Sequence, residues 1–77
     1  MAQKLTFEHD ADGDILLISQ APPYPERETG ELGDDVIARM NPRTHEIEHL
    51  EVLSWSSRLE GGGVFELPVS AILRLAS

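Results

Sequence analysis

The sequence lacks cysteine, and its 77 residues include only one tryptophan, one tyrosine and two phenylalanines. A chain without cysteine has neither disulfides nor thiolate metal ligands. A domain of this length buries little apolar surface, and small domains are commonly stabilised by disulfides, by a metal or by a second subunit. The sequence therefore favours a homodimer, ahead of a metal site built from carboxylates or histidines.

Basic residues are also scarce: six Lys and Arg stand against fourteen Asp and Glu, for a formal net charge of −8. This balance argues against binding to nucleic acid, which requires a surplus of cations, and against binding to anionic membranes. It permits a small basic protein as partner, which an acidic surface would attract. The alternative is that the charge only keeps a small protein soluble.

Long hydrophobic runs are absent. The longest aliphatic run covers residues 15–18, whereas a membrane-spanning helix needs about 20 residues. The first residues contain no apolar stretch of the kind found in signal peptides. We therefore expect a cytoplasmic protein without a membrane partner.

Residues 4–20 are predicted to form a hairpin. Apolar and polar side chains alternate from Leu5 onward, which indicates a strand. Asp12-Gly13 is typical of a two-residue hairpin turn, and this turn places Phe7 opposite Ile18. The predicted core face consists of Leu5, Phe7, Leu16 and Ile18.

Residues 21–35 are rich in proline, glycine and acidic side chains, and they are predicted to form a loop with a short extended piece around Glu28. A second hairpin follows over residues 36–54, with strands at 36–40 and 47–53 and a turn at 41–44. In its second strand, Ile47 and Leu53 fall on the face opposite Leu50. This pattern predicts either a β-bulge or a cover on both faces.

The end of the chain is predicted to contain the helix. Residues 54–63 are polar and glycine-rich, which indicates a flexible connector. Residues 68–76 carry Pro68 in the first turn and apolar side chains at helical spacing. The expected fold is a single α+β domain over residues 1–77, in which an antiparallel four-stranded sheet of two hairpins packs with a short C-terminal helix.

The acidic and histidine side chains are the candidates for chemistry. Asp10, Asp12 and Asp14 alternate as in a calcium loop, but the glycine and the final glutamate of that motif are missing. His45 and His49 are four residues apart, which on a strand separates them by about 13 Å. A metal-binding or hydrolytic protein that uses the three aspartates and the histidines, including His9, is the alternative function. The main expectation is a protein with no enzymatic activity, no catalytic residue, no metal and no cofactor.

Two aromatic residues are candidates for partner contacts. Tyr24 lies among prolines in the acidic loop, and Trp55 follows the last strand in a polar stretch. Tryptophan is enriched at interface hot spots, although either aromatic ring would also serve as a cover over the edge of the core. Both residues are therefore predicted partner-binding residues of an interaction module.

Three segments of the chain resemble the YuzE-like family of small bacterial proteins. They are the hairpin of residues 9–18, the Gly33-Asp34-Asp35-Val36-Ile37 segment, and the strand of residues 49–56. His9, Asp12 and Leu17 replace the Tyr, Glu and second Tyr that are usual in the family. Trp55 also departs from the family pattern. The resemblance covers roughly residues 4–57.

The resemblance implies a four-stranded β arrangement with a helix, and no established activity. Some members of that family lie beside small toxin-like proteins, which suggests an antitoxin-like role for a chain of this kind.

Overall fold

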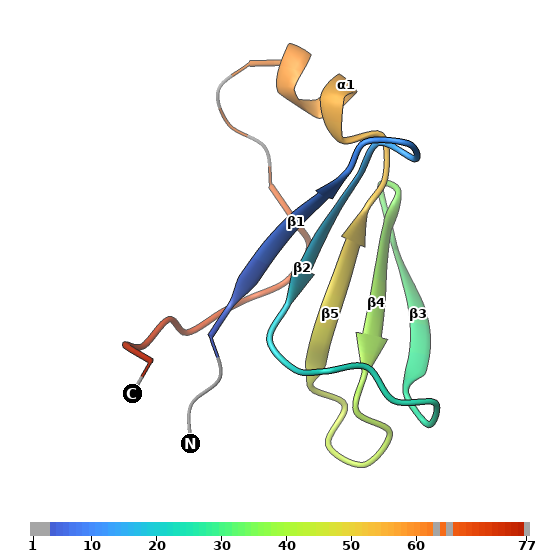
Figure 1. Ribbon diagram of the computed structural model, residues 1–77, viewed down its shortest axis with the longest axis vertical. Helices are drawn as coiled ribbons and strands as arrows, with labels where there is room; N and C mark the ends of the chain where they lie inside the picture. The colour runs from blue at the N-terminus through green and yellow to red at the C-terminus, as the bar shows by residue number, and fades with distance from the viewer. Residues whose placement is uncertain (1–3, 63, 65, 77) are drawn as a thin grey trace.

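The computed structural model describes residues 4–62, 64 and 66–76. These residues form a five-stranded antiparallel sheet with the order β1-β2-β5-β4-β3 and one short helix (Figure 1). The elements are β1 (Thr6–Asp10), β2 (Ile15–Ser19), β3 (Glu28–Gly33), β4 (Val36–Met40), β5 (Ile47–Val52) and α1 (Trp55–Glu60). The α+β class and the antiparallel sheet are confirmed, but the predicted number of four strands is wrong.

The additional strand is β3, which lies inside the segment predicted to be a loop and begins at Glu28, where a short extended piece was predicted. Its two glycines are tolerated because β3 is an edge strand that pairs only with β4. The register shifts between Glu31 and Gly33, and Gly33 has a φ of 87° that favours glycine. The prolines of the segment all precede Arg27 and leave the ladder intact.

The first hairpin has the predicted register, with Phe7 opposite Ile18. Its turn differs from the prediction, because it spans residues 11–14 and the left-handed residue is Asp14 (φ 54°). The Asp10 carboxylate accepts hydrogen bonds from the backbone N–H groups of Asp12 (3.1 Å) and Gly13 (3.4 Å). This side-chain turn removes the need for positive φ at Gly13.

The second hairpin contains a bulge, which was one of the two alternatives that the sequence left open. Arg39 pairs with His49 and Met40 pairs with Ile47, so Glu48 is an additional residue in β5. The bulge turns Ile47 toward the face that carries Leu50, where Ile47 packs on the core.

The core lies on one face of the sheet and centres on Val36, Ala38 and Leu50. Leu67 and Val69 of the C-terminal segment pack against this face. Figure 1 shows this segment crossing the sheet. The opposite face carries the polar members of the same strands, together with Leu17 and Ile37, which both pair with Glu51. Alternation along β5 thus separates an apolar side from a polar one.

The helix predicted at residues 68–76 is wrong: these residues form neither helix nor strand. About two turns have little stability of their own in water, and Leu67 and Val69 contact the sheet from a non-helical chain. The helix lies instead at α1, in the predicted connector. There the Asp14 carboxylate accepts hydrogen bonds from the backbone N–H (3.0 Å) and hydroxyl (2.5 Å) of Ser56.

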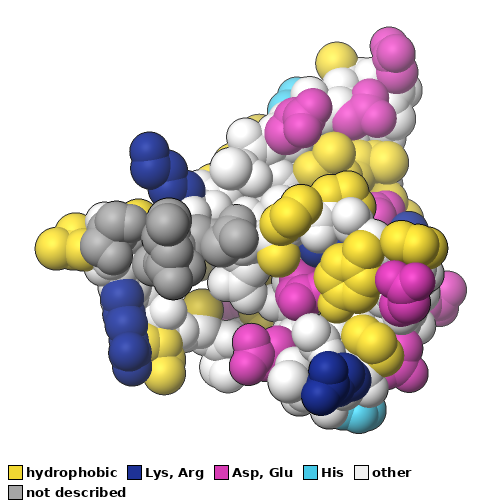
Figure 2. All heavy atoms as spheres, turned by 60° about the horizontal axis from the view of Figure 1, so that its bottom comes forward, with side chains coloured by type: hydrophobic (Ala, Val, Ile, Leu, Met, Phe, Trp, Pro, Cys, Tyr) yellow, Lys and Arg dark blue, Asp and Glu magenta, His cyan; other side chains and the backbone are white. Residues whose placement is uncertain are grey.

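The outer strand β1 is exposed along its whole length. The prediction that Phe7 belongs to the core is therefore wrong, because the exposed fraction of Phe7 is 63 %. The same prediction is confirmed for Leu16 on β2, which is buried. Figure 2 shows hydrophobic side chains (yellow) exposed among acidic ones. Within the described residues, no helix has the length and apolar character to cross a bilayer.

Candidate functional site

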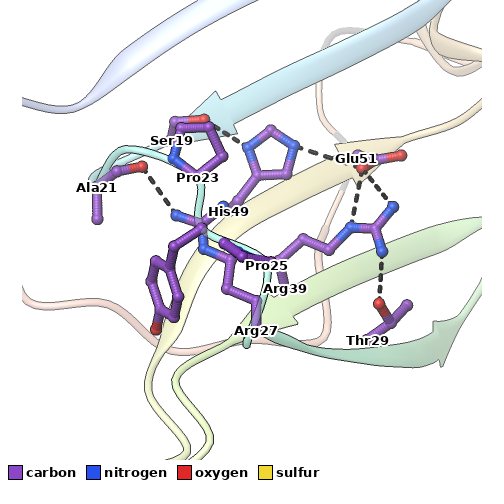
Figure 3. Close-up of a pocket in the computed structure, with 10 residues that line it drawn as sticks. Ser19, Ala21, Pro23, Pro25, Arg27, Thr29, Arg39, His49 and Glu51 are labelled. Atoms are coloured by element: carbon purple, nitrogen blue, oxygen red, sulfur yellow. Dashed lines mark hydrogen bonds and ion pairs between the residues drawn. The ribbon is translucent and has the colours of Figure 1, made fainter.

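A hollow with a volume of about 500 Å³ opens on the polar face of the sheet (Figure 3). The strands contribute its floor, and the loop of residues 21–27 contributes one wall. The floor residues are Ser19, Thr29, Arg39, His49 and Glu51.

Strand register brings the floor residues together from distant parts of the sequence. Ser19 on β2 and Arg39 on β4 both pair with His49 on β5, and Thr29 on β3 pairs with Arg39. These four side chains form a row across four strands, because opposed residues in antiparallel strands point to the same face. Glu51 lies two residues beyond His49 and therefore shares the face.

The row is connected by hydrogen bonds and ion pairs. The Ser19 Oγ lies 2.5 Å from the His49 Nδ1, and the His49 Nε2 lies 3.5 Å from the Glu51 Oε2. The same carboxylate oxygen accepts from the Arg39 Nη2 at 3.1 Å and from its Nε at 3.2 Å. Arg39 also donates to the Thr29 hydroxyl. Each charged group of the floor thus has a partner of opposite charge.

His49 is held neutral by its surroundings. Its side chain is 16 % exposed, and burial lowers the pKa of His49 below its usual 6.5, with smaller contributions from Arg27 and Arg39. The Glu51 carboxylate raises this pKa and only partly offsets the burial. In the tautomer that satisfies both contacts, Nδ1 accepts from the Ser19 hydroxyl and Nε2 donates to Glu51.

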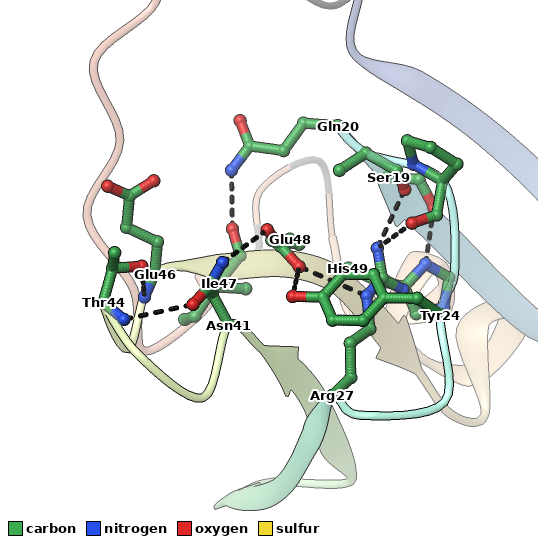
Figure 4. Close-up of polar contacts among 12 residues, drawn as sticks. Ser19, Gln20, Tyr24, Arg27, Asn41, Thr44, Glu46, Ile47, Glu48 and His49 are labelled. Atoms are coloured by element: carbon green, nitrogen blue, oxygen red, sulfur yellow. Dashed lines mark hydrogen bonds and ion pairs between the residues drawn. The ribbon is translucent and has the colours of Figure 1, made fainter.

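A second network surrounds the bulged Glu48 and includes Tyr24 and Arg27, which line the hollow (Figure 4). The Glu48 carboxylate accepts from the Tyr24 hydroxyl at 2.8 Å, the Arg27 Nε at 3.3 Å and the Asn41 Nδ2 at 3.5 Å. The Tyr24 hydroxyl is the main reason that the pKa of Glu48 lies below its usual 4.5. Arg27 also donates to the carbonyl of Ala21 at 2.9 Å. The network fastens the loop of residues 21–27 to the bulge.

The two predicted contact residues occupy different places. The Tyr24 hydroxyl is bonded to Glu48 within the protein, and its ring, with the Arg27 guanidinium carbon 5.2 Å from the centroid, lines the hollow. Trp55 begins α1, is half-buried, and donates its backbone N–H to the Asp14 carbonyl at 2.9 Å. Tyr24 follows β2 and Trp55 follows the antiparallel β5, so they lie at opposite ends of the sheet.

The aspartates and histidines of the alternative function are dispersed. Asp10 holds the first turn, and Asp14 holds α1 and contacts the His9 Nε2 at 3.2 Å. The Ser56 hydroxyl is the main reason that the pKa of Asp14 lies below its usual 3.8. His45 is exposed in the second turn and His49 lies on the sheet. In the described part of the chain, no three His, Asp or Glu side chains converge in a way that could hold a metal ion.

A second feature is a set of exposed apolar residues on the edge strand β1, directly before it and on the C-terminal segment, which we call the apolar edge: Leu5, Phe7, Ile72, Leu73 and Leu75. Leu5 and Leu73 line one shallow hollow, together with Lys4 and Arg74. The exposed fraction reaches 96 % at Leu75. Side chains of this size seldom gather in water without a partner.

Ser19, Arg39 and Glu51 were not identified from the sequence as site residues. A usable signal existed, because His49 and Glu51 alternate with the buried Leu50 and Val52 and therefore share a face. The pairing of this face with Ser19 and Arg39 depends on strand order and on the bulge.

No family model matches the chain, and no curated protein or solved structure matches it. The resemblance to the YuzE-like family therefore stays a prediction.

Proposed function

We propose that this protein is a non-catalytic interaction module that binds another protein through the apolar edge. The observation that carries this proposal is the exposure of Phe7 on the edge strand β1 and of Ile72, Leu73 and Leu75 on the C-terminal segment. Ile72 and Leu73 of that segment lie beside Leu5, which precedes β1. Covering such side chains contributes about 25 cal/mol per Å² of apolar area removed from water.

If the partner is a different protein and not a second copy of this chain, the charges of the chain favour a basic one. The net charge is −8, and both half-buried arginines of the polar face are already paired with Glu48 and Glu51. The surface field is therefore acidic, and it attracts cationic proteins at low ionic strength. An antitoxin-like role toward a small basic protein is consistent with this field.

The test is a capture experiment with matched variants. Wild-type protein is compared with Phe7→Ser and Leu73→Ser, which alter the apolar edge, and with Leu59→Ser, an exposed leucine on α1. A specific partner, once purified, is expected to bind the wild type and Leu59→Ser equally and the two edge variants at least about tenfold more weakly, since each loses a buried apolar side chain. Equal binding by all four proteins would contradict the proposal.

Salt dependence of the same binding reports the nature of the partner. Binding that weakens between low and high salt indicates a basic protein. Salt-independent binding that still requires Phe7 indicates an apolar contact.

A second candidate function, hydrolysis of a small ester, is favoured by the 2.5 Å contact between the Ser19 Oγ and the His49 Nδ1. A hydroxyl next to a neutral imidazole is the pairing used for nucleophilic catalysis. Ser19 would attack the carbonyl carbon while its proton passes to Nδ1, the alcohol would leave with that proton, and water would release the acid.

Hydrolysis of p-nitrophenyl acetate tests the second candidate. Ser19→Ala and His49→Gln are expected to reduce the rate to the level of buffer alone, whereas His45→Gln, at an exposed position in the second turn, keeps it. Rates that do not differ between the wild type and Ser19→Ala would remove this candidate.

A further inference from the structure

The two open edges of the sheet differ in how well they are protected. β3 carries Gly30, Gly33 and a register shift, and such irregularities hinder pairing with another strand. β1 contains neither proline nor glycine, and its five residues pair with β2 without a shift. Its outer side is therefore a regular template for a further strand.

The hydrogen bonds of β2 determine which groups of β1 face outward. The backbone N–H of Gln20 donates to the Glu48 carbonyl at 3.0 Å, so the backbone groups of Gln20 are directed toward β5. The direction of the backbone N–H and C=O groups alternates from residue to residue along an antiparallel strand. The backbone groups of Ser19 are therefore directed toward β1, where Ser19 pairs with Thr6. The same alternation turns the backbone groups of Phe7 and His9 toward the open side. Leu5 precedes β1 by one residue, and its backbone groups would face the same way if the strand were extended to it.

We propose that β1 pairs antiparallel with β1 of a second copy about a two-fold axis at Phe7, joining two sheets into one. The proposal rests on the proposed function and names its partner. In this register Phe7 faces the partner's Phe7, and Leu5 faces the partner's His9. With β1 extended to Leu5, all these residues have outward backbone groups, and each such pair exchanges two hydrogen bonds.

Charge complementarity supports the same register. It places Lys4 opposite the partner's Asp10, and the two-fold axis repeats the contact. A register centred on Glu8 would oppose two carboxylates, which is destabilising. A register centred on Thr6 would also set Lys4 opposite a carboxylate, that of the partner's Glu8, but it leaves His9 and Asp10 unpaired within the described residues. A shift by one residue would join the apolar face of one sheet to the polar face of the other.

The C-terminal segment supplies apolar surface at the same place. Leu73 and Arg74 line a hollow with Lys4 and Leu5, and Figure 1 shows the segment passing the start of β1 and ending beyond it. A second copy at β1 would lie over this segment and would cover Leu73 and Leu75. The apolar edge is thereby continuous with the paired strands.

The test combines ultracentrifugation with cross-linking, and it uses the absence of native cysteine. Wild-type protein is expected to form a dimer between micromolar and submillimolar concentrations. His9→Pro removes an outward N–H and leaves the β2 ladder intact, so the dissociation constant should rise roughly tenfold or more. Phe7→Cys should form a disulfide dimer under mild oxidation, whereas Thr29→Cys on the other edge should not. Circular dichroism confirms that each variant is folded.

The outcomes separate the inference from the proposed function. A dimer that His9→Pro does not weaken, and in which Phe7→Cys and Thr29→Cys cross-link equally, would overturn the β1 pairing. A wild type that stays monomeric would overturn it too. Should a monomer still bind a different protein in a Phe7-dependent manner, the interaction module would stand with another partner.

Discussion

His49 lies between a hydroxyl and a carboxylate on the polar face, and its protonation is unfavourable there. Its pKa lies below 6.5 in the folded protein, mainly because of burial. Above 6.5 the imidazole is neutral in both the folded and the unfolded chain. Below 6.5 the unfolded chain binds the proton more readily, so His49 lowers the free energy of unfolding as the pH falls toward its folded pKa.

We expect the free energy of unfolding to decrease between about pH 7.5 and pH 5.5, before the carboxylates titrate. His49→Gln should flatten this decrease, whereas His45→Gln, at an exposed turn position, should retain it. Urea denaturation across the range measures the effect. A decrease that His49→Gln leaves unchanged would assign the pH dependence to another group.

Leu50 is buried at the centre of the core, opposite Ala38 on one side and Ile18 on the other. Leu50→Ala is expected to lower the free energy of unfolding by about 2–5 kcal/mol, because it removes apolar contacts and leaves a cavity. Leu59→Ala, at an exposed position on α1, should change it by about 0.5 kcal/mol or less. Equal losses of unfolding free energy for the two variants, measured by urea denaturation, would contradict the position of Leu50 at the centre of the core.

At the scale of elements, α1 depends on a residue far away in the sequence. Its N-cap residue, Ser54, makes no side-chain capping bond, and the Asp14 carboxylate binds the Ser56 N–H instead. Asp14 also has a φ of 54°, which glycine adopts without strain. Removing the carboxylate by Asp14→Gly therefore tests the contact without straining the backbone.

Asp14→Gly should increase hydrogen exchange at the Trp55 and Ser56 amides and shift the tryptophan fluorescence. Asp35→Gly is the matched control, because Asp35 has a φ of 60° and lies in the exposed β3–β4 turn. We expect the control to leave α1 protected. Similar exchange in both variants would contradict the role of the Asp14 side chain.

The C-terminal segment acts as a partial second layer. Ending the chain after Glu66 removes Leu67 and Val69 from the core face, and we expect a loss of roughly 2 kcal/mol from their incomplete burial. Ending it after Ser70 keeps both residues and should leave the stability of the monomer nearly unchanged. Thermal unfolding of the two truncated proteins at low concentration makes the comparison, and equal midpoints would show that this packing contributes little.

At the scale of the whole molecule, the charge of −8 produces self-repulsion in the compact state. The half-buried Arg27–Glu48 pair is screened less than exposed charges are. Added sodium chloride is therefore expected to raise the melting temperature. A melting temperature that falls with added salt would show that attractive ion pairs dominate. The experiment uses sodium chloride because sulfate also strengthens the burial of apolar surface.

Local patterns in the sequence determined the α+β class, the register of the first hairpin and four of the strands. Alternation and turn residues act over a few positions, so they need no knowledge of the rest of the chain. The same patterns misplaced the helix, because Asp14 stabilises α1 from 42 residues away. They also predicted only a short extended piece around Glu28 instead of the whole of β3, whose glycines are acceptable only at the edge of a sheet.

What only the tertiary structure decided is which residues meet. Ser19 and His49 are 30 residues apart and touch because β2 pairs with β5. Ile47 joins the core because Glu48 forms a bulge, and Phe7 is exposed because β1 lies at an open edge. Strand order and bulges arise from competition among many long-range pairings, and a periodicity of two fixes the face of a residue but not its neighbour.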